Sequence, residues 1–379
     1  MVRSFPHPPH QGLRRPPPPA EPARPAGEGE PHRRMSPAAT VAVAAGLVIA
    51  LAVSVVAAIG IGSALIPPAE TARYLWAALT GGTITADEVT TYQIIWQVRA
   101  PRVLLAAIVG AGLSVVGVAV QAMVRNALAD PFVLGVSSGA SVGAVTVSVF
   151  GVFTAFGVYA MSVGAFAGAL LASVLVFAAA QGRTGLTPLR LVLTGVAVSF
   201  ALQAVMSVII YLAPDGEATG MVLYWTMGSF GAATWGSLPV VAAAVLLGTV
   251  VLRRHGRALD VMALGDEVST SLGVDGARIR TRLFVLTSLL TGAMVAVSGA
   301  IGFVGLVMPH LVRLVVGAGH TRVLTIAPPV GAIFMVWVDL LSRTLVAPRE
   351  LPVGVITALV GVPVFVILIR RKGYLFGGR

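Results

Sequence analysis

Residues 103–124 read VLLAAIVGAGLSVVGVAVQAMV, a run of 22 residues without a charged side chain. An α-helix needs about 20 apolar residues to cross the hydrocarbon core of a bilayer, so this run predicts one membrane-spanning helix. Arg102 precedes the run and Arg125 follows it. The stretch therefore indicates a fold of membrane-crossing helices with charges at their ends.

Further uncharged runs repeat this pattern along the chain, over residues 36–69, 131–182, 191–214, 218–252, 283–309, 323–338 and 351–369. The run over 131–182 has 52 residues, which is enough for two helices joined by a tight turn. Two stretches, 302–317 and 219–235, stay open as further short spans. The pattern predicts an all-α, polytopic transmembrane protein.

The composition excludes other classes. Of 379 residues, 56% are hydrophobic and 11% charged, where soluble domains carry about 25% charged residues. So little polar surface could not coat a soluble globule. The chain has no cysteine, which excludes a disulfide scaffold and any thiolate metal site.

The net charge of +11 comes from 25 arginines and a single lysine, Lys372. The arginines lie in short clusters between the apolar runs, where the charges that orient a membrane protein are found, rather than in a nucleic-acid-binding face. Residues 1–34 differ from the rest, with ten prolines in the first 31 positions. We expect a disordered cytoplasmic tail there, with Met35 as an alternative start, and one transmembrane domain over 35–379.

Polar and turn-forming residues gather on both sides of the opening run. Asp130 followed by Pro131 is a helix-stop signal. The residues of this block are Arg99, Arg102, Gln121, Asn126, Asp130, Pro131, Gly135, Ser137, Ser138 and Gly139.

This block resembles the signature of the FecCD-type permeases, the membrane subunits of bacterial importers for ferric siderophores, haem and cobalamin. Three further blocks carry the resemblance, at 263–274, at 299–313 with Pro309, His310 and Arg313, and at 350–365 with Glu350, Pro352 and Gly354. The blocks follow one another in the family's order over roughly residues 95–370, so only the tail lies outside the resemblance.

The resemblance implies about ten spans with both termini cytoplasmic, and short helices near the outer surface and after Pro309. In that topology 21 basic residues lie inside and 5 outside, as the positive-inside rule requires. A short pattern recurs in the two halves of the chain: Gly110-Ala111 with Gly117, and Gly292-Ala293 with Gly299. This limited repeat favours inverted-repeat-like halves.

A nucleotide-hydrolysing P-loop needs Gly-Lys followed by Ser or Thr, but Lys372 lies between Arg371 and Gly373. We therefore expect a transport subunit that is not an enzyme and binds no cofactor, with ATP and Mg used by a separate ATPase subunit. A cytoplasmic coupling loop at about 253–282 has apolar residues at helical spacing among its charges. The resemblance implies that it docks on the ATPase through Ala263, Leu264, Gly265, Asp266, Glu267, Leu272, Gly273 and Val274; a solvated loop is the alternative.

On the outer side, the resemblance places Arg99, Arg102 and Arg343 where permeases meet acidic residues of an extracytoplasmic binding protein. Exposed arginines suit this role because their planar fork pairs with carboxylates. Alternatives are snorkelling at the interface and pairing of Arg343 with Asp339, four residues earlier.

The substrate that we predict is a ferric siderophore, carried between two permease copies or one copy and a paralogue; cobalamin or haem is the alternative. Thr187 is a possible gate, although Pro188 stiffens its turn. Two other classes stay open: a proton-coupled transporter using Asp339, and an intramembrane hydrolase using Ser137, Ser138, Asp130 and His310. We expect His310 to be structural rather than an iron ligand.

Overall fold

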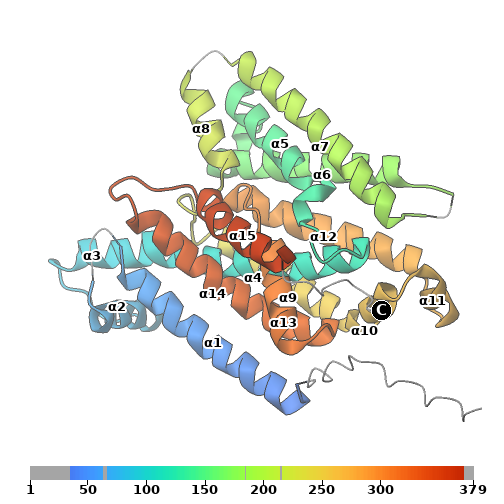
Figure 1. The fold of residues 1–379 in the computed structure, drawn as a ribbon. Helices are drawn as coiled ribbons and strands as arrows, with labels where there is room; N and C mark the ends of the chain where they lie inside the picture. The colour runs from blue at the N-terminus through green and yellow to red at the C-terminus, as the bar shows by residue number, and fades with distance from the viewer. Residues whose placement is uncertain (1–34, 63–65, 184, 214–215, 371–379) are drawn as a thin grey trace, which may run out of the picture. The chain divides into compact units, whose positions relative to one another are not determined.

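The computed structural model describes residues 35–62, 66–183, 185–213 and 216–370. Within these ranges all regular elements are helices (Figure 1). The predicted tail over 1–34 and Lys372 lie outside the described residues. The alternative start at Met35 and the division into tail and domain stay predictions.

Six helices are long and apolar enough to cross a membrane by length and composition. These are α1 (Pro37–Gly60), α4 (Ala100–Val124, with the preceding turns), α6 (Ala160–Ala180), α7 (Pro188–Tyr211), α12 (Gly276–Ser298) and α14 (His320–Thr344). A seventh candidate is the pair α9 (Leu238–Arg254) and α10 (Gly256–Ala263), bent by 58°. Three shorter apolar helices complete the set: α5 (Val136–Phe150), α13 (Val304–Val316) and α15 (Val353–Arg370).

The remaining elements lie at the ends of these helices. They are α2 (Pro68–Thr80), α3 (Val89–Gln93), the π-helix η1 (Ile94–Arg99), the 3₁₀-helices η2 (Pro131–Leu134) and η3 (Thr154–Tyr159), α8 (Gly216–Thr226) and α11 (Asp266–Ser271). The short helix that we expected near the outer surface corresponds to α8. The short helix expected after Pro309 is wrong in its bounds, because Pro309 lies inside α13.

Helix α4 is the centre of the packing. It contacts α14, α12, α13 and α9, and most of its residues are buried. Glycines allow the closest approaches: a Cβ at Gly110 would overlap the Gly331 carbonyl of α14, and one at Gly117 would overlap Gly305 of α13. Small residues at helix interfaces let backbones meet in this way, and packing of this kind holds helices together in lipid.

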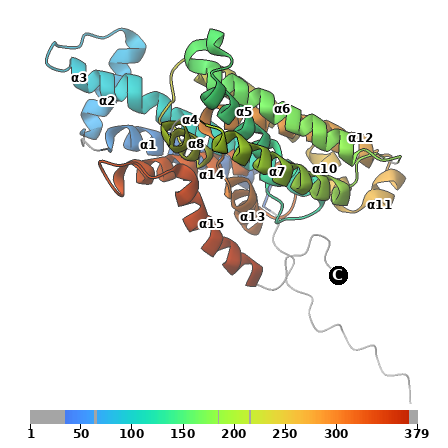
Figure 2. The same cartoon turned by 90° about the horizontal axis from the view of Figure 1, so that it is seen from above.

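Figures 1 and 2 place α2 and α3 at one end of the helices and α10 and α11 at the other. The α2 end carries Arg73, Arg99, Arg102, Arg343 and Arg349, which are the five basic residues on the predicted outer side. Met35, before α1, lies at the α10 end, because its carbonyl accepts from Arg322 and the nearby His320 bonds Asp260 of α10. We call the α10 end the inner end, because the predicted topology places the residues before α1 and the arginines of 253–282 on the cytoplasmic side.

Candidate functional site

The outer end holds a buried ionic cluster between α4 and α14. The Asp339 carboxylate is fully buried and accepts from Arg102 Nε at 2.8 Å and Arg343 Nε at 3.1 Å. The pairing of Arg343 with Asp339 that the four-residue spacing predicted is confirmed. Arg102 also donates from Nη1 to Glu350 at 2.8–2.9 Å. One carboxylate therefore joins two spans, and Glu350 extends the cluster to the surface.

The expectation that these outer arginines are exposed is wrong. Arg99, Arg102 and Arg343 are only 6%, 6% and 9% exposed. Arg99 donates to the carbonyls of Ile59 and Gly60 at the end of α1, and Arg343 donates to the Ala58 carbonyl. The sequence could not show this, because the carbonyls that hold them belong to a helix 39 or more residues away.

The block around Glu350 ties the start of α15 to the segment that follows α8. Val353 and Gly354 donate their backbone N–H groups to Gly228 and Met227 at 3.0 and 2.9 Å. A Cβ at Gly354 would overlap the Met227 carbonyl, so only glycine fits there. Pro352 precedes the first turn of α15. These signature residues hold the start of α15 in place.

Gln121, Pro309 and Arg313 form one network between α4 and α13. Proline lacks an N–H, so Pro309 leaves the carbonyl four residues earlier without its helical donor. That carbonyl belongs to Gly305, and the Gln121 amide donates to it at 3.4 Å and to Leu306 at 3.1 Å. Arg313 in turn donates to the Gln121 amide oxygen. The network lets a proline-containing helix lie buried against α4.

Asp130 joins two blocks that are far apart in the sequence. Its carboxylate accepts from Phe132 N at 2.8 Å, which caps η2, and from Phe303 N at 3.3 Å, just before α13. Gly135 ends η2 with a φ of 78°, a conformation that glycine adopts readily. Asp130, Pro131 and Gly135 therefore shape the turn from α4 into α5.

The other predicted residues have local roles. Asn126 accepts from Leu128 N at 2.9 Å in the turn after α4, and Thr187 caps α7 by accepting from Arg190 N at 3.4 Å. A Cβ at Gly139 would overlap α6 at Ala172, so Gly139 sets the contact of α5 with α6. His310 is buried in α13.

A cavity of about 480 Å³ lies between η2, α5 and α7. It has no charged residue in its lining, which includes Phe132, Ser137, Ser138, Ser141, Ser199 and Gln203. Ser137 Oγ has no hydrogen-bond partner in the part of the chain that the structure describes, so no base activates it as a nucleophile there. Among those same residues no group of three or more His, Asp or Glu side chains could hold a metal ion.

At the inner end, the short helices α10 and α11 lie within the predicted coupling loop at about 253–282. Leu259 and Met262 of α10 are buried, and α10 packs on α4 and α14. Ser269 Oγ of α11 donates to the Val261 carbonyl at 3.0 Å, which fixes α11 to α10. The opposite face is open: Leu264 and Leu272 are 62% and 59% exposed.

The remaining loop residues complete this open face. Gly265 has a φ of 111° and Gly273 one of 76°, so these glycines form the turns at both ends of α11. Asp266 and Glu267 lie in its first turn, where acidic residues are favoured, and both are exposed. Ala263 and Val274 are half-buried beside them.

Sequence reasoning did not single out Arg280, which connects this helix pair to the spans. Its buried guanidinium donates to the Leu186 carbonyl before α7 at 2.6 Å, to the Met123 carbonyl of α4 at 3.3 Å and to Asp266 of α11 at 2.8 Å. Arg125 approaches the same carboxylate at 3.5 Å. A movement of α11 would therefore reach the inner ends of α4 and α7 directly. In the sequence, nothing distinguishes Arg280 from its neighbours Arg278 and Arg282.

These features define a class: a multi-pass membrane protein with an exposed apolar face at its predicted inner end. A model of the FecCD transport family matches residues 49–371, and the chain belongs to that family. It is accordingly a permease of the ATP-binding-cassette (ABC) importers.

Several known proteins are similar over most of their length. The ABC transporter permease protein YvrB of Bacillus subtilis is 42% identical, over 85% of this chain and 91% of its own. The hemin transport system permease protein HmuU of Yersinia pestis is 43% identical, over 73% of this chain and 84% of its own. A solved structure of a metal-chelate type ABC transporter in an inward-facing conformation has a TM-score of 0.75 and 32% identity, and it covers 87% of this chain and 99% of that one.

Proposed function

We propose that the chain is the permease subunit of an ABC importer for a ferric siderophore. Family relatives include import permeases for Fe(3+)-citrate and iron(3+)-hydroxamate from Bacillus subtilis. The observation that carries the proposal is the exposed apolar face of α10 and α11 on a chain that has no P-loop. Such a face needs a protein partner to cover it.

The partner at this face is a separate ATPase subunit, which uses ATP and Mg. Leu264, Val268 and Leu272 present apolar side chains that this partner would bury. Asp266 and Arg280 then carry its movement to α4 and α7. Two permease copies, or one copy and a paralogue, enclose the pathway. The exposed face of α7, with Leu193 and Phe200, suits this contact.

The uncharged cavity beside α7 supports a chelate as substrate. Its serine, glutamine and phenylalanine lining offers hydroxyl, amide and aromatic contacts to a bulky ligand that already encloses its metal. Thr187 at the inner start of α7 stays a candidate gate.

The binding protein docks at the outer end, near Glu350. Because Arg102 is already paired there, an acidic residue of that partner would compete with Glu350 for Arg102 Nη1. Arg99 and Arg343 donate to carbonyls at the end of α1, and they would hold this part of the docking surface in position.

Cobalamin or haem is the second candidate substrate, since relatives include a cobalamin permease from Halobacterium salinarum and HmuU. Uptake of labelled chelates by a strain lacking this gene separates them. We expect loss of ferric siderophore uptake, restored by the intact gene. If the strain loses only cobalamin or haem uptake, that compound is the substrate in place of a ferric siderophore. Uptake that survives ATP depletion would favour a proton-coupled transporter instead.

A further inference from the structure

A groove runs along the described helices between α6 and α9, with α12 as its floor. It consists of three cavities of about 420, 700 and 470 Å³ that share lining residues. The outer and middle cavities share Tyr159, Ser162 and Ser237, and the middle and inner cavities share Val251, Leu286 and Leu289. The three are therefore continuous from the outer end of α9 to its inner end.

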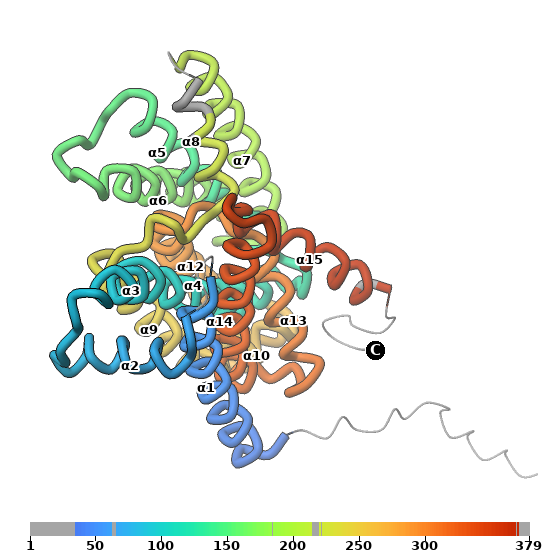
Figure 3. The backbone as a smooth tube through the Cα atoms, turned by 90° about the vertical axis from the view of Figure 1, so that its left-hand side faces the viewer, coloured from blue at the N-terminus to red at the C-terminus, as the bar shows by residue number. Residues whose placement is uncertain are grey.

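The arrangement of the three helices explains the groove. Helix α12 packs on both α6 and α9, and Figure 3 shows α6 and α9 on opposite sides of α12. Gly248 allows the close contact with the floor, since a Cβ there would overlap Leu290. The middle of the groove is almost wholly aliphatic, and Val240 and Leu247 on its wall are well exposed.

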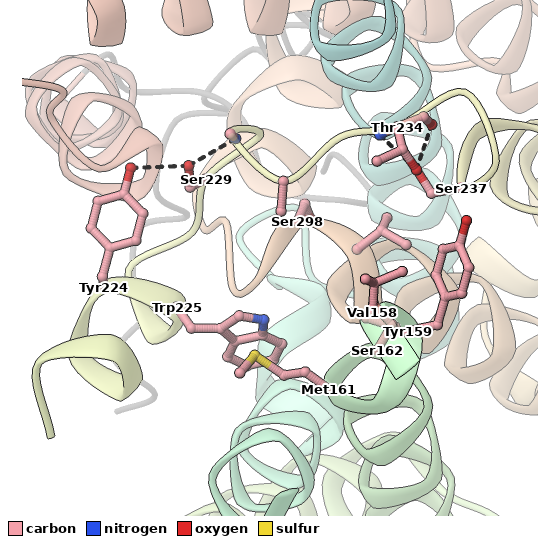
Figure 4. A pocket seen from close by; sticks show the side chains of 14 residues that line it. Val158, Tyr159, Met161, Ser162, Tyr224, Trp225, Ser229, Thr234, Ser237 and Ser298 are labelled. Carbon is pink, nitrogen blue, oxygen red and sulfur yellow. Dashed lines mark hydrogen bonds between the residues drawn. The ribbon is translucent and has the colours of Figure 1, made fainter. Parts of the chain in front are cut away.

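The two ends of the groove differ in chemistry. Figure 4 shows the outer cavity, lined by Tyr159, Tyr224, Trp225 and hydroxyl side chains, with no charged residue. The inner cavity is lined by His255 and Arg282, and Arg253 and Arg254 are exposed beside them at the end of α9.

The arginines at the inner end divide into bonded ones and ones without an ion pair. Arg280 and Arg125 are bonded to Asp266, but Arg253, Arg254 and Arg282 have no ion pair among the residues described. Three exposed cations at the cytoplasmic end of an apolar groove complement an anionic phosphate at that depth.

The length of the groove fits one leaflet. From Val240 to Val251 helix α9 rises about 17 Å, at roughly 1.5 Å per residue. Half of the hydrocarbon core of a bilayer is about 15 Å. An acyl chain whose phosphate lies at Arg282 would therefore extend along most of the aliphatic part.

We propose that this groove binds one anionic phospholipid of the cytoplasmic leaflet, with its phosphate at Arg282 and His255 and an acyl chain between α6 and α9. A second permease copy does not suit the groove. Two copies related by a two-fold axis along the membrane normal would bring their inner-end arginines to the same level, where like charges repel.

The test is native mass spectrometry of the full chain in detergent, titrated with phosphatidylglycerol or phosphatidylcholine. We expect preferential binding of one phosphatidylglycerol, and Arg282→Gln should weaken it roughly fivefold, as loss of one cation near a lipid phosphate predicts. Arg183→Gln, which removes an exposed arginine outside the groove, is the matched control and should bind as the parent does. Equal affinity for both lipids, or no effect of Arg282→Gln, would overturn the proposal.

A second pair of variants tests the acyl-chain position. Ala293→Phe adds a ring to the groove floor and should reduce binding of both lipids, whereas Ala45→Phe on the exposed face of α1 should not. Unchanged binding in a folded Ala293→Phe protein contradicts the proposal. Because the chain has no cysteine, Leu247→Cys also reports directly on a second copy: a disulfide between two chains at that position would assign the groove to a protein contact.

Discussion

The outer and inner ends of the molecule both contain arginine–carboxylate clusters, but the two clusters differ in burial and in what they connect. At the outer end Asp339, Arg102 and Arg343 are buried and bonded among α1, α4 and α14. At the inner end Asp266 is exposed, and Leu264 and Leu272 project beside it. The outer cluster therefore stabilises the fold, while the inner cluster connects the spans to a surface that needs a partner.

The largest expected effect is the loss of Asp339. Asp339→Asn keeps the shape but leaves Arg102 and Arg343 without their shared buried carboxylate, which should cost about 3–5 kcal/mol of stability. Thermal unfolding in detergent measures this, with the exposed Asp87→Asn as control. A stable Asp339→Asn protein that no longer transports would instead favour the proton-coupled alternative.

Loss of Arg280 should come next. Arg280→Gln removes the hydrogen bonds to the Leu186 and Met123 carbonyls and to Asp266, which is worth about 2–3 kcal/mol. In the assembled transporter we expect ATP hydrolysis to continue while uptake falls. Arg278→Gln, on an exposed side chain of the same helix, is the control. Uptake and hydrolysis that fall in proportion would remove Arg280 from the coupling path.

The inner surface itself is tested by Leu264→Asp and Leu272→Asp. Each should weaken binding of the ATPase subunit about 10–100-fold, since burying one leucine contributes about 1.5–3 kcal/mol. The permease alone should keep its stability, because both side chains are exposed. Leu189→Asp, also exposed, at the start of α7, is the matched control. Equal affinity in all four proteins would mean that α10 and α11 are not the docking face.

A smaller change is expected at the rim of the outer cluster. Glu350→Gln weakens the competitor for Arg102 Nη1, so binding-protein affinity should rise by up to about fivefold, the effect of a partly exposed ion pair. Surface plasmon resonance with the permease in nanodiscs measures it. Weaker docking in this variant would mean that Glu350 itself contacts the partner.

The smallest effect concerns the exposed pair of Arg73 and Glu88. Its hydrogen bond from Arg73 lowers the pKa of Glu88 to about 2 from its usual 4.5. A carboxyl group whose pKa is lowered by folding stabilises the folded state at pH values above its unfolded-state pKa. This contribution is lost as the pH falls through the folded-state pKa. The stability difference between the parent and Glu88→Gln should therefore be small at pH 7 and vanish between pH 4.5 and 2. A difference that grows on acidification contradicts this pairing.

The sequence was sufficient for the fold class and for the family, because hydropathy and the order of the blocks depend on neighbouring residues. It also predicted the Asp339–Arg343 pair, which lies within one helix. It was insufficient where the partner comes from another helix. The burial of Arg99 depends on carbonyls of α1, the role of Arg280 depends on Met123 and Leu186, and Pro309 stays helical because Gln121 of α4 supplies the missing donor.

The central claim is that the chain is a conduit moved by an ATPase bound at its inner end. Uptake of labelled ferric siderophore into proteoliposomes, with binding protein present and the ATPase subunit added or omitted, tests it most directly. The account predicts uptake only when the ATPase and Mg-ATP are both present, and none with Leu264→Asp/Leu272→Asp. Uptake at the same rate by the permease without its ATPase would contradict it.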